Sequence, residues 1–290
     1  MIKIIDTFKE FKEVFQNNLD LSIEEKIELW DKAYICKFPE LEKKIKEDYD
    51  LNGYNWREIA KSKVFNNTKK DYEKMMQAYN NILQIINGIN KKVFDIFNLD
   101  LELNIVLYCG LCNSAGWVDR YNGKRAVFYG IDKIAELEWH TIEKLDPLIA
   151  HELCHVIHFE LRGEDDLPKE VEKNKYNIGI WRIYEEGFAQ FYQNKLLGKD
   201  VDSRGKEWLK KCNDKKNDLK KLYEQALKEE EGTKRFFGDW FKILGVSDAG
   251  YFLGAELIKK LDQKYSIKDL AQLNFSIIEK EVLDYLHDDN

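Results

Sequence analysis

The first part of the chain, residues 1–95, carries its apolar residues at helical spacing. Between Phe8 and Phe15 they recur every three or four positions, which places them along one face of a short helix. Residues 22–25 have the sequence of a capping box, which opens a second helix. The same spacing returns over residues 68–86. These patterns predict an N-terminal layer of packed helices.

Two short segments after this region have the composition of β-strands. Residues 101–108 read LELNIVLY and residues 126–129 read AVFY, with a loop containing Gly and Asn at 110–123. The helical pattern then resumes almost to the end of the chain, and residues 206–231 have the dense charge of a solvated helix pair. We therefore predict a predominantly α-helical α+β fold with a small mixed sheet.

Three regions are expected along the chain: the helical layer at 1–95, a core of small sheet and helices at 96–265, and a C-terminal helical segment at 266–290. The 290 residues include 46 Lys+Arg and 53 Asp+Glu, a net charge of -7. Nucleic acid is not an expected partner, because phosphate binding needs a cationic surface.

Cellular location is also constrained by the sequence. No apolar run approaches the roughly 18 residues of a membrane-crossing helix, so no membrane insertion is expected. Charged residues interrupt the N-terminal segment every two or three positions, unlike a signal peptide. The five cysteines are odd in number and mostly far apart, unlike a secreted disulfide framework. These features predict a cytoplasmic protein.

The clearest candidate chemistry is the sequence HELCH, which begins at His151 and ends at His155. Asp146 is a favourable N-cap and Pro147 suits the first helical position, so we expect a helix to begin there. Histidines four residues apart project from one helix face, where both can bind one zinc ion. Glu152 can then hold the attacking water. The alternative is a polar helix face that merely carries two histidines.

A zinc site needs a third protein ligand. His158 lies on the same face but about 10.5 Å of helical rise from His151, so we expect it to pack at the surface or to orient a ligand. Glu185 and Glu186 are better placed, because the Gly and Ala that follow permit two helices to approach closely. The alternative for these two is ordinary first-turn acids favoured by the helix dipole.

Together these motifs resemble the gluzincin zinc peptidases over about residues 101–261. HELCH is followed, 31 residues after its last histidine, by Glu186 within the sequence EEGFA. The resemblance implies that Glu186 is the third zinc ligand. It implies that Glu185 either supports the zinc ligands without binding the metal or faces the substrate. It implies a zincin-like metallopeptidase core at 96–265.

In particular, the chain is similar to a bacterial set of predicted Zn-dependent proteases in which HExxH and EGxA precede a GYxxG segment. That segment is GYFLG here and contains Tyr251. The resemblance implies that Tyr251 stabilises the oxyanion formed at the scissile carbonyl. Asp239 and Asp248 are both candidates for orienting a ligand histidine.

The gluzincins also bind extended peptide along an edge strand above the metal. Residues 126–130 are correctly placed for that strand, so the resemblance implies that Phe128 and Tyr129 contact substrate. The chain lacks a GAMEN-type stretch, by which the aminopeptidase branch recognises a free N-terminus. Aminopeptidase activity is therefore not expected.

The sequence thus predicts zinc-dependent hydrolysis of a peptide or protein substrate, with Zn²⁺ as cofactor and Glu152 as general base. Two alternatives stay open. A catalytically inactive protein can keep the zinc ligands to hold its helices together and bind a partner. A thiol-redox protein can use Cys109 and Cys112, although this pair follows a predicted strand, whereas redox pairs open a helix.

Overall fold

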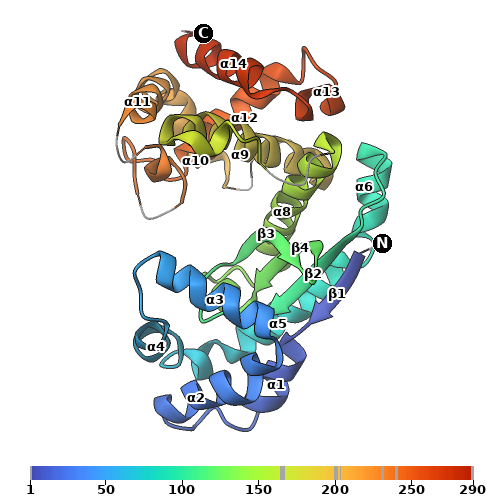
Figure 1. Cartoon of the computed structure of the whole chain (residues 1–290), viewed down its shortest axis with the longest axis vertical. Helices are drawn as coiled ribbons and strands as arrows, with labels where there is room; N and C mark the ends of the chain where they lie inside the picture. Colours follow the sequence, from blue (N-terminus) through green and yellow to red (C-terminus); the bar gives the residue numbers. More distant parts are fainter. Residues whose placement is uncertain are drawn as a thin grey trace. The chain divides into compact units, whose positions relative to one another are not determined.

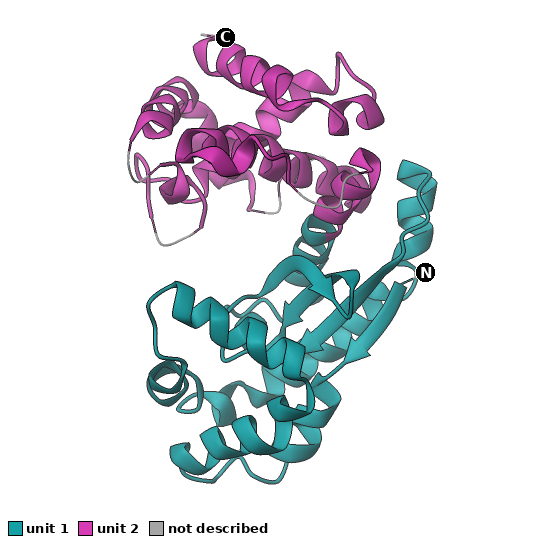
Figure 2. Ribbon diagram, viewed as in Figure 1, with its two compact units in different colours: residues 1–152 teal, residues 153–290 magenta. Residues whose placement is uncertain are grey.

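The computed structural model describes residues 2–163, 167–198, 202, 204–229, 232–238 and 241–288. It is predominantly helical with one small mixed sheet, which confirms the predicted fold class (Figure 1). The chain forms two compact units, residues 1–152 and 153–290, and their boundary lies within helix α8 (Ile142–Arg162) (Figure 2). The region boundaries predicted near residues 95 and 265 stay predictions.

The first unit contains a four-stranded sheet and the helices around it. The strands are β1 (Ile2–Asp6), β2 (Leu103–Tyr108), β3 (Gly116–Tyr121) and β4 (Lys124–Gly130). The α-helices between β1 and β2 are α1 (Phe8–Phe15), α2 (Ile23–Leu29), α3 (Pro39–Leu51), α4 (Trp56–Ile59), α5 (Thr68–Ile86) and α6 (Ile89–Phe97). Helix α7 (Ile131–Glu136) follows β4 and leads to α8.

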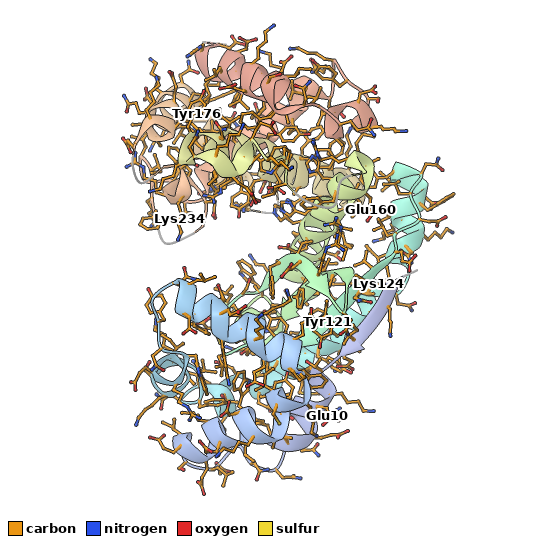
Figure 3. All side chains as sticks on the ribbon, in the orientation of Figure 1. Glu10, Tyr121, Lys124, Glu160, Tyr176 and Lys234 are labelled. Carbon is orange, nitrogen blue, oxygen red and sulfur yellow. The ribbon has the colours of Figure 1, made fainter. Side chains whose placement is uncertain are left out.

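The strand order is β1-β2-β4-β3, in which β1, β2 and β4 are parallel and β3 is antiparallel to β4. Strands β2 and β4 are confirmed predictions. The prediction that residues 1–95 are helical is wrong for β1, and the predicted loop at 110–123 contains β3. A two-residue turn with positive φ at Asn122 and Gly123 joins β3 to β4, so that Tyr121 and Lys124 pair across it (Figure 3).

The hydrophobic core of the first unit lies between the N-terminal helices and the sheet. Phe8, Phe11 and Phe15 of α1 are buried, as their helical spacing predicts. Trp30 and Tyr34 are buried beside them, and both bind the main chain of Cys109 just after β2. The indole N–H of Trp30 donates to the Cys109 carbonyl at 3.0 Å, and the Cys109 N–H donates to the Tyr34 hydroxyl at 3.0 Å. These bonds connect the helical layer to the end of a central strand.

In the described residues, the second unit contains the end of α8 and six further α-helices. They are α9 (Lys175–Leu197), α10 (Lys206–Asp214), α11 (Lys216–Lys228), α12 (Ala249–Leu261), α13 (Ile267–Ala271) and α14 (Phe275–His287). Helices α10 and α11 confirm the charged helix pair predicted at 206–231. Across the described part of the chain, no helix combines the length and the apolar character that a membrane crossing needs.

Helix α8 begins earlier than predicted. Its first residue is Ile142, and the Thr141 carbonyl accepts hydrogen bonds from the N–H groups of Lys144 and Leu145. Pro147 therefore lies inside the helix, and the prediction that it occupies the first helical position is wrong. An additional turn that starts after Thr141 precedes the proline. Proline has no N–H to donate, but this costs one bond near the helix start and does not end the helix.

Candidate metal centre

Three side chains from two helices bring metal-binding atoms together. One donor atom each from His151, His155 and Glu186 lies within 4.8 Å of the other two. The two histidines stand one turn apart on α8, as the motif predicts, and Glu186 comes from α9. All three side chains are half-buried, so the cluster is neither sealed in the core nor fully exposed.

The spacing of these donors suits a zinc ion. His155 Nε2 and Glu186 Oε2 are 3.5 Å apart. Two ligands bound at zinc distances in a tetrahedral site stand about 3.4 Å apart. Two imidazoles and one carboxylate also form a ligand set found in catalytic zinc sites, which leave one position open. The residues present therefore fit Zn²⁺.

Helix α9 places Glu186 in its middle. The helix begins after Asn174, whose side chain caps it by accepting from the N–H of Asn177 at 2.8 Å. Glu186 is thus the twelfth helical residue. The alternative that Glu185 and Glu186 are first-turn acids is therefore wrong, since the helix dipole acts only on the end turns.

Glu185 lies outside the group of converging donors. Its Oε2 accepts a hydrogen bond from the indole N–H of Trp181 at 2.8 Å, one turn earlier on the same helix. Burial raises the pKa of Glu185, and the charge of the neighbouring Glu186 adds to this, while His155 acts in the opposite direction. Of the two adjacent acids, it is Glu186 whose carboxylate joins the histidines.

Glu152 is close to the first strand residue of β3. Its side chain is only 8% exposed. A Cβ atom added at Gly116 would stand 3.0 Å from both Cγ and Oε1 of Glu152, tighter than ordinary van der Waals contact. The lack of a side chain at Gly116 therefore leaves the space that the Glu152 carboxylate occupies.

The predicted substrate-binding strand is not at the sheet edge. Strand β4, which carries Phe128 and Tyr129, lies between β2 and β3, and both side chains are fully buried. The Phe128 ring stacks on Trp117 of β3 at 4.1 Å, and burial, with the Glu152 charge, raises the pKa of Tyr129 well above its usual value. The edge-strand prediction is wrong for β4, and the edge on this side of the sheet is β3.

Sequence reasoning missed β3, although a signal was present. The dipeptide Asn122-Gly123 stands between two segments rich in β-branched and aromatic residues. This is a strong short-range signal for a hairpin with a two-residue turn. This hairpin signal predicts a strand immediately before the one expected at residues 126–129. That additional strand is β3, which forms the edge of the sheet.

His158 is buried, so the expectation that it packs at the surface is wrong. The Tyr184 hydroxyl donates to the carbonyl of Leu270 at 2.7 Å and lies 3.0 Å from His158 Nε2. Because the hydroxyl has one proton, His158 Nε2 donates to it. Burial lowers the pKa of His158 well below its usual value, so the ring is neutral. It serves as a core hydrogen-bond donor.

Tyr251 lies in the first turn of α12, as predicted. Its ring packs against Phe237 with a centroid separation of 5.3 Å, and the guanidinium carbon of Arg204 is 4.5 Å from its ring centre. Asp248, a candidate for orienting a ligand histidine, instead accepts from the N–H of Gly238 at 3.0 Å and pairs with Arg204 at 3.4 Å. The other candidate, Asp239, lies outside the described residues.

The cysteine pair has the wrong environment for a reactive thiol. Asp132 accepts from the N–H groups of Gly110 and Cys112 at 3.1 and 2.8 Å, which fixes the loop after β2. Burial, together with the Asp132 carboxylate, raises the pKa of the Cys109 and Cys112 thiols well above the usual value. Redox cysteines require the opposite shift, so this loop does not favour the thiol-redox alternative.

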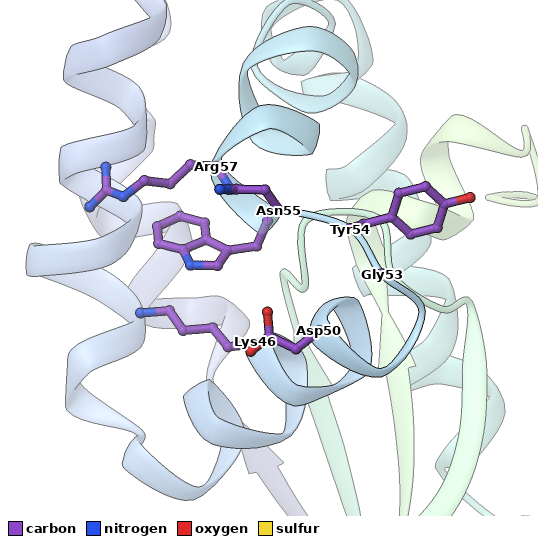
Figure 4. A pocket seen from close by; sticks show the side chains of 7 residues that line it. Lys46, Asp50, Gly53, Tyr54, Asn55 and Arg57 are labelled. Atoms are coloured by element: carbon purple, nitrogen blue, oxygen red, sulfur yellow. The ribbon is translucent and has the colours of Figure 1, made fainter.

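A separate pocket of about 460 Å³ lies beside α3 and α4 in the first unit (Figure 4). The indole of Trp56 contacts two cations there, with Lys46 Nζ 4.7 Å and Arg57 Cζ 4.6 Å from the ring centre. Both cations also bind Asp31 at 2.9 Å. Their charge is thereby compensated, and none of the three metal-binding side chains lines this pocket.

Comparison of the chain with profiles of known protein families, with curated proteins and with solved structures finds no match in any of the three. A functional conclusion for this chain therefore depends on its own residues: the HELCH helix, the carboxylate of Glu186 and the packing around them.

Proposed function

We propose that the protein is a zinc-dependent hydrolase of peptide bonds, similar to the gluzincins. The observation that carries the proposal is the convergence of His151, His155 and Glu186 from α8 and α9. Two histidines at this spacing can occur on a helix by chance, and a carboxylate from another helix 3.5 Å from the second one is a further feature that a zinc site needs. The acid that a hydrolase requires, Glu152, directly follows the first histidine.

Each residue has a defined task in this reaction. A zinc ion held by the three ligands would supply Lewis acidity toward the substrate carbonyl and the attacking water. Glu152 takes the proton of that water and returns it to the leaving amine. The Tyr251 hydroxyl donates a hydrogen bond to the oxygen that becomes negative in the transition state. Strand β3, at the end of the sheet order, is the strand to which an extended peptide can add.

Metal content tests the ligand assignment directly. We expect about one zinc per chain in wild type, as such a site holds a single ion, and a loss or marked weakening in Glu186→Ala. Glu185→Ala is the matched control: it removes the adjacent acid on the same helix, which binds Trp181 and not the cluster, and should retain zinc. Mass spectrometry of protein purified without added metal measures both.

Two results of this comparison would contradict the assignment. Wild type that holds no zinc even after reconstitution would make HELCH a coincidence. Equal zinc loss in Glu185→Ala and Glu186→Ala would mean that the acids act through the structure of α9 rather than through coordination.

The close approach of Gly116 to Glu152 predicts a second effect. In Gly116→Val the new side chain displaces the carboxylate, so kcat should fall roughly 10- to 100-fold, the cost of moving a reacting group by about 1 Å. Zinc content should not change, because Glu152 is not among the converging donors. Val118→Ile, two residues along the same strand, is the control and should keep its activity. Equal kcat in both variants would refute this role for Gly116.

A further inference from the structure

Arg204 is the charged residue that lies against the ring of Tyr251. Its guanidinium carbon is 4.5 Å from the centre of that ring and 5.2 Å from the ring of Trp208 on α10. A guanidinium group at these distances is attracted to the π-electron face of an aromatic ring. The side chain therefore contacts two aromatic residues from two different helices.

The guanidinium is held by hydrogen bonds on its other side. Its Nη1 donates to Gln190 Oε1 at 3.0 Å, and its Nε lies 3.4 Å from Asp248 Oδ2. Gln190 is only 1% exposed, and its own amide donates to Asp202 at 2.6 Å. A planar guanidinium bound at two positions in this way has one orientation, so the face that it presents to Tyr251 is fixed.

The same network also restrains a second neighbour of the Tyr251 ring, Phe237. Asp248, at φ 59°, uses its second oxygen to accept from the N–H of Gly238. That bond holds the segment containing Phe237, whose ring meets Tyr251 at an interplanar angle of 81°. Arg204 thus contacts the Tyr251 ring directly and, through Asp248, supports the segment of Phe237, which also contacts that ring.

The network also includes a residue of α9, the helix that carries the metal-binding side chain of Glu186. Gln190 is four residues after Glu186 on α9, so the two residues share a face of that helix. Arg204 therefore connects Tyr251 on α12 to α9 through one buried amide.

We propose that Arg204 is a positioning residue for Tyr251, which fixes the phenol relative to the helix of Glu186. The inference rests on the proposed function, in which Tyr251 donates to the developing oxyanion. Such a donor acts only when it stands about 2.7–3.1 Å from the position of that oxygen. A tyrosine ring held by Arg204 and Phe237 is ordered before substrate binds, whereas an unrestrained ring must be ordered during the reaction.

A double-mutant cycle on the metal-loaded full chain tests this role. We expect Tyr251→Phe to lower kcat about 100-fold, as for the loss of an oxyanion donor, and Arg204→Met to lower it roughly 10-fold by misplacing the phenol. In the Tyr251→Phe background, Arg204→Met should change kcat less than about 3-fold, because residues that act as a unit are not additive. KM and zinc content should stay near wild type in each variant.

Arg204→Lys keeps the charge but not the planar group, so it should restore only part of kcat. If Arg204→Met does not fold, the same double-mutant cycle is measured with Arg204→Lys and tests the same positioning role. Non-additivity with Tyr251→Phe is again the expected result. Additive losses in kcat, or a loss that appears mainly in KM, would overturn the positioning role alone. A zinc-loaded wild type that cleaves no peptide would overturn the proposed function and this inference with it.

Discussion

Replacing Glu152 with Gln is expected to lower kcat for peptide hydrolysis by about 10²- to 10⁴-fold, the usual contribution of a general base, while zinc content stays unchanged. Glutamine has nearly the same size and can still form hydrogen bonds, so it fits the space beside Gly116, but its amide cannot accept the proton of the attacking water. The metal is retained because Glu152 is not one of the three converging donors. Metal analysis and cleavage of a peptide library, each on the same preparation, measure the two effects.

Glu143→Gln is the matched control, because Glu143 is an exposed acid in the first turn of the same helix. It should retain both activity and zinc. Full activity in Glu152→Gln would show that another group takes the proton. Zinc without turnover in wild type, on every peptide of the library, would instead favour the inactive zinc-stabilised scaffold.

Features of the fold that depend on neighbours within one helical turn could be predicted from the sequence. The helix expected at 68–86 is α5, with the same bounds. The capping box at 22–25 is formed by reciprocal bonds: the Glu25 N–H donates to Ser22 Oγ, and the Ser22 N–H donates to the Glu25 carboxylate. In both cases the interacting groups lie three or four positions apart, so the pattern contains the whole interaction.

Features that depend on distant segments could not be predicted in this way. Strand β1 pairs with β2 in a register that matches Ile2 to Leu103, so its strand character comes from a partner about a hundred residues away. The isoleucines of this segment favour a strand, but it is short, has charges at Lys3 and Asp6 and leads directly into the helical pattern that begins at Phe8. The position of β4 inside the sheet likewise depends on which strands it pairs with.

The same distinction applies to the metal site. The convergence of His151 and His155 follows from helical spacing alone. The choice between Glu185 and Glu186 came from a family resemblance, because two adjacent acids differ only in the rotation of their helix. That rotation depends on which face of α9 packs against α12, a non-local contact centred on Gly187 and Gly254.

The contact between Gly187 and Gly254 predicts the largest effect on stability. A Cβ added at Gly254 would lie 2.5 Å from the carbonyl oxygen of Ile183 and 2.7 Å from the Cα of Gly187. These are main-chain atoms of α9, so the two helices must move apart. We expect Gly254→Ala to lower the free energy of unfolding by about 1–3 kcal/mol, as overpacking does, although the same change at an open helical position stabilises by roughly 0.5–1 kcal/mol.

Gly179→Ala on α9 is the control, because its added Cβ meets the ends of two side chains, Leu227 and Thr233, which can move. Its unfolding free energy should change much less than that of Gly254→Ala in urea titrations. Because Glu186 directly precedes Gly187, separation of the helices should also weaken zinc binding in Gly254→Ala, measured by competition with a chromophoric chelator. Stabilisation by Gly254→Ala would mean that α9 and α12 do not pack through their main chains, and the rotation that directs Glu186 toward His155 would then need another cause.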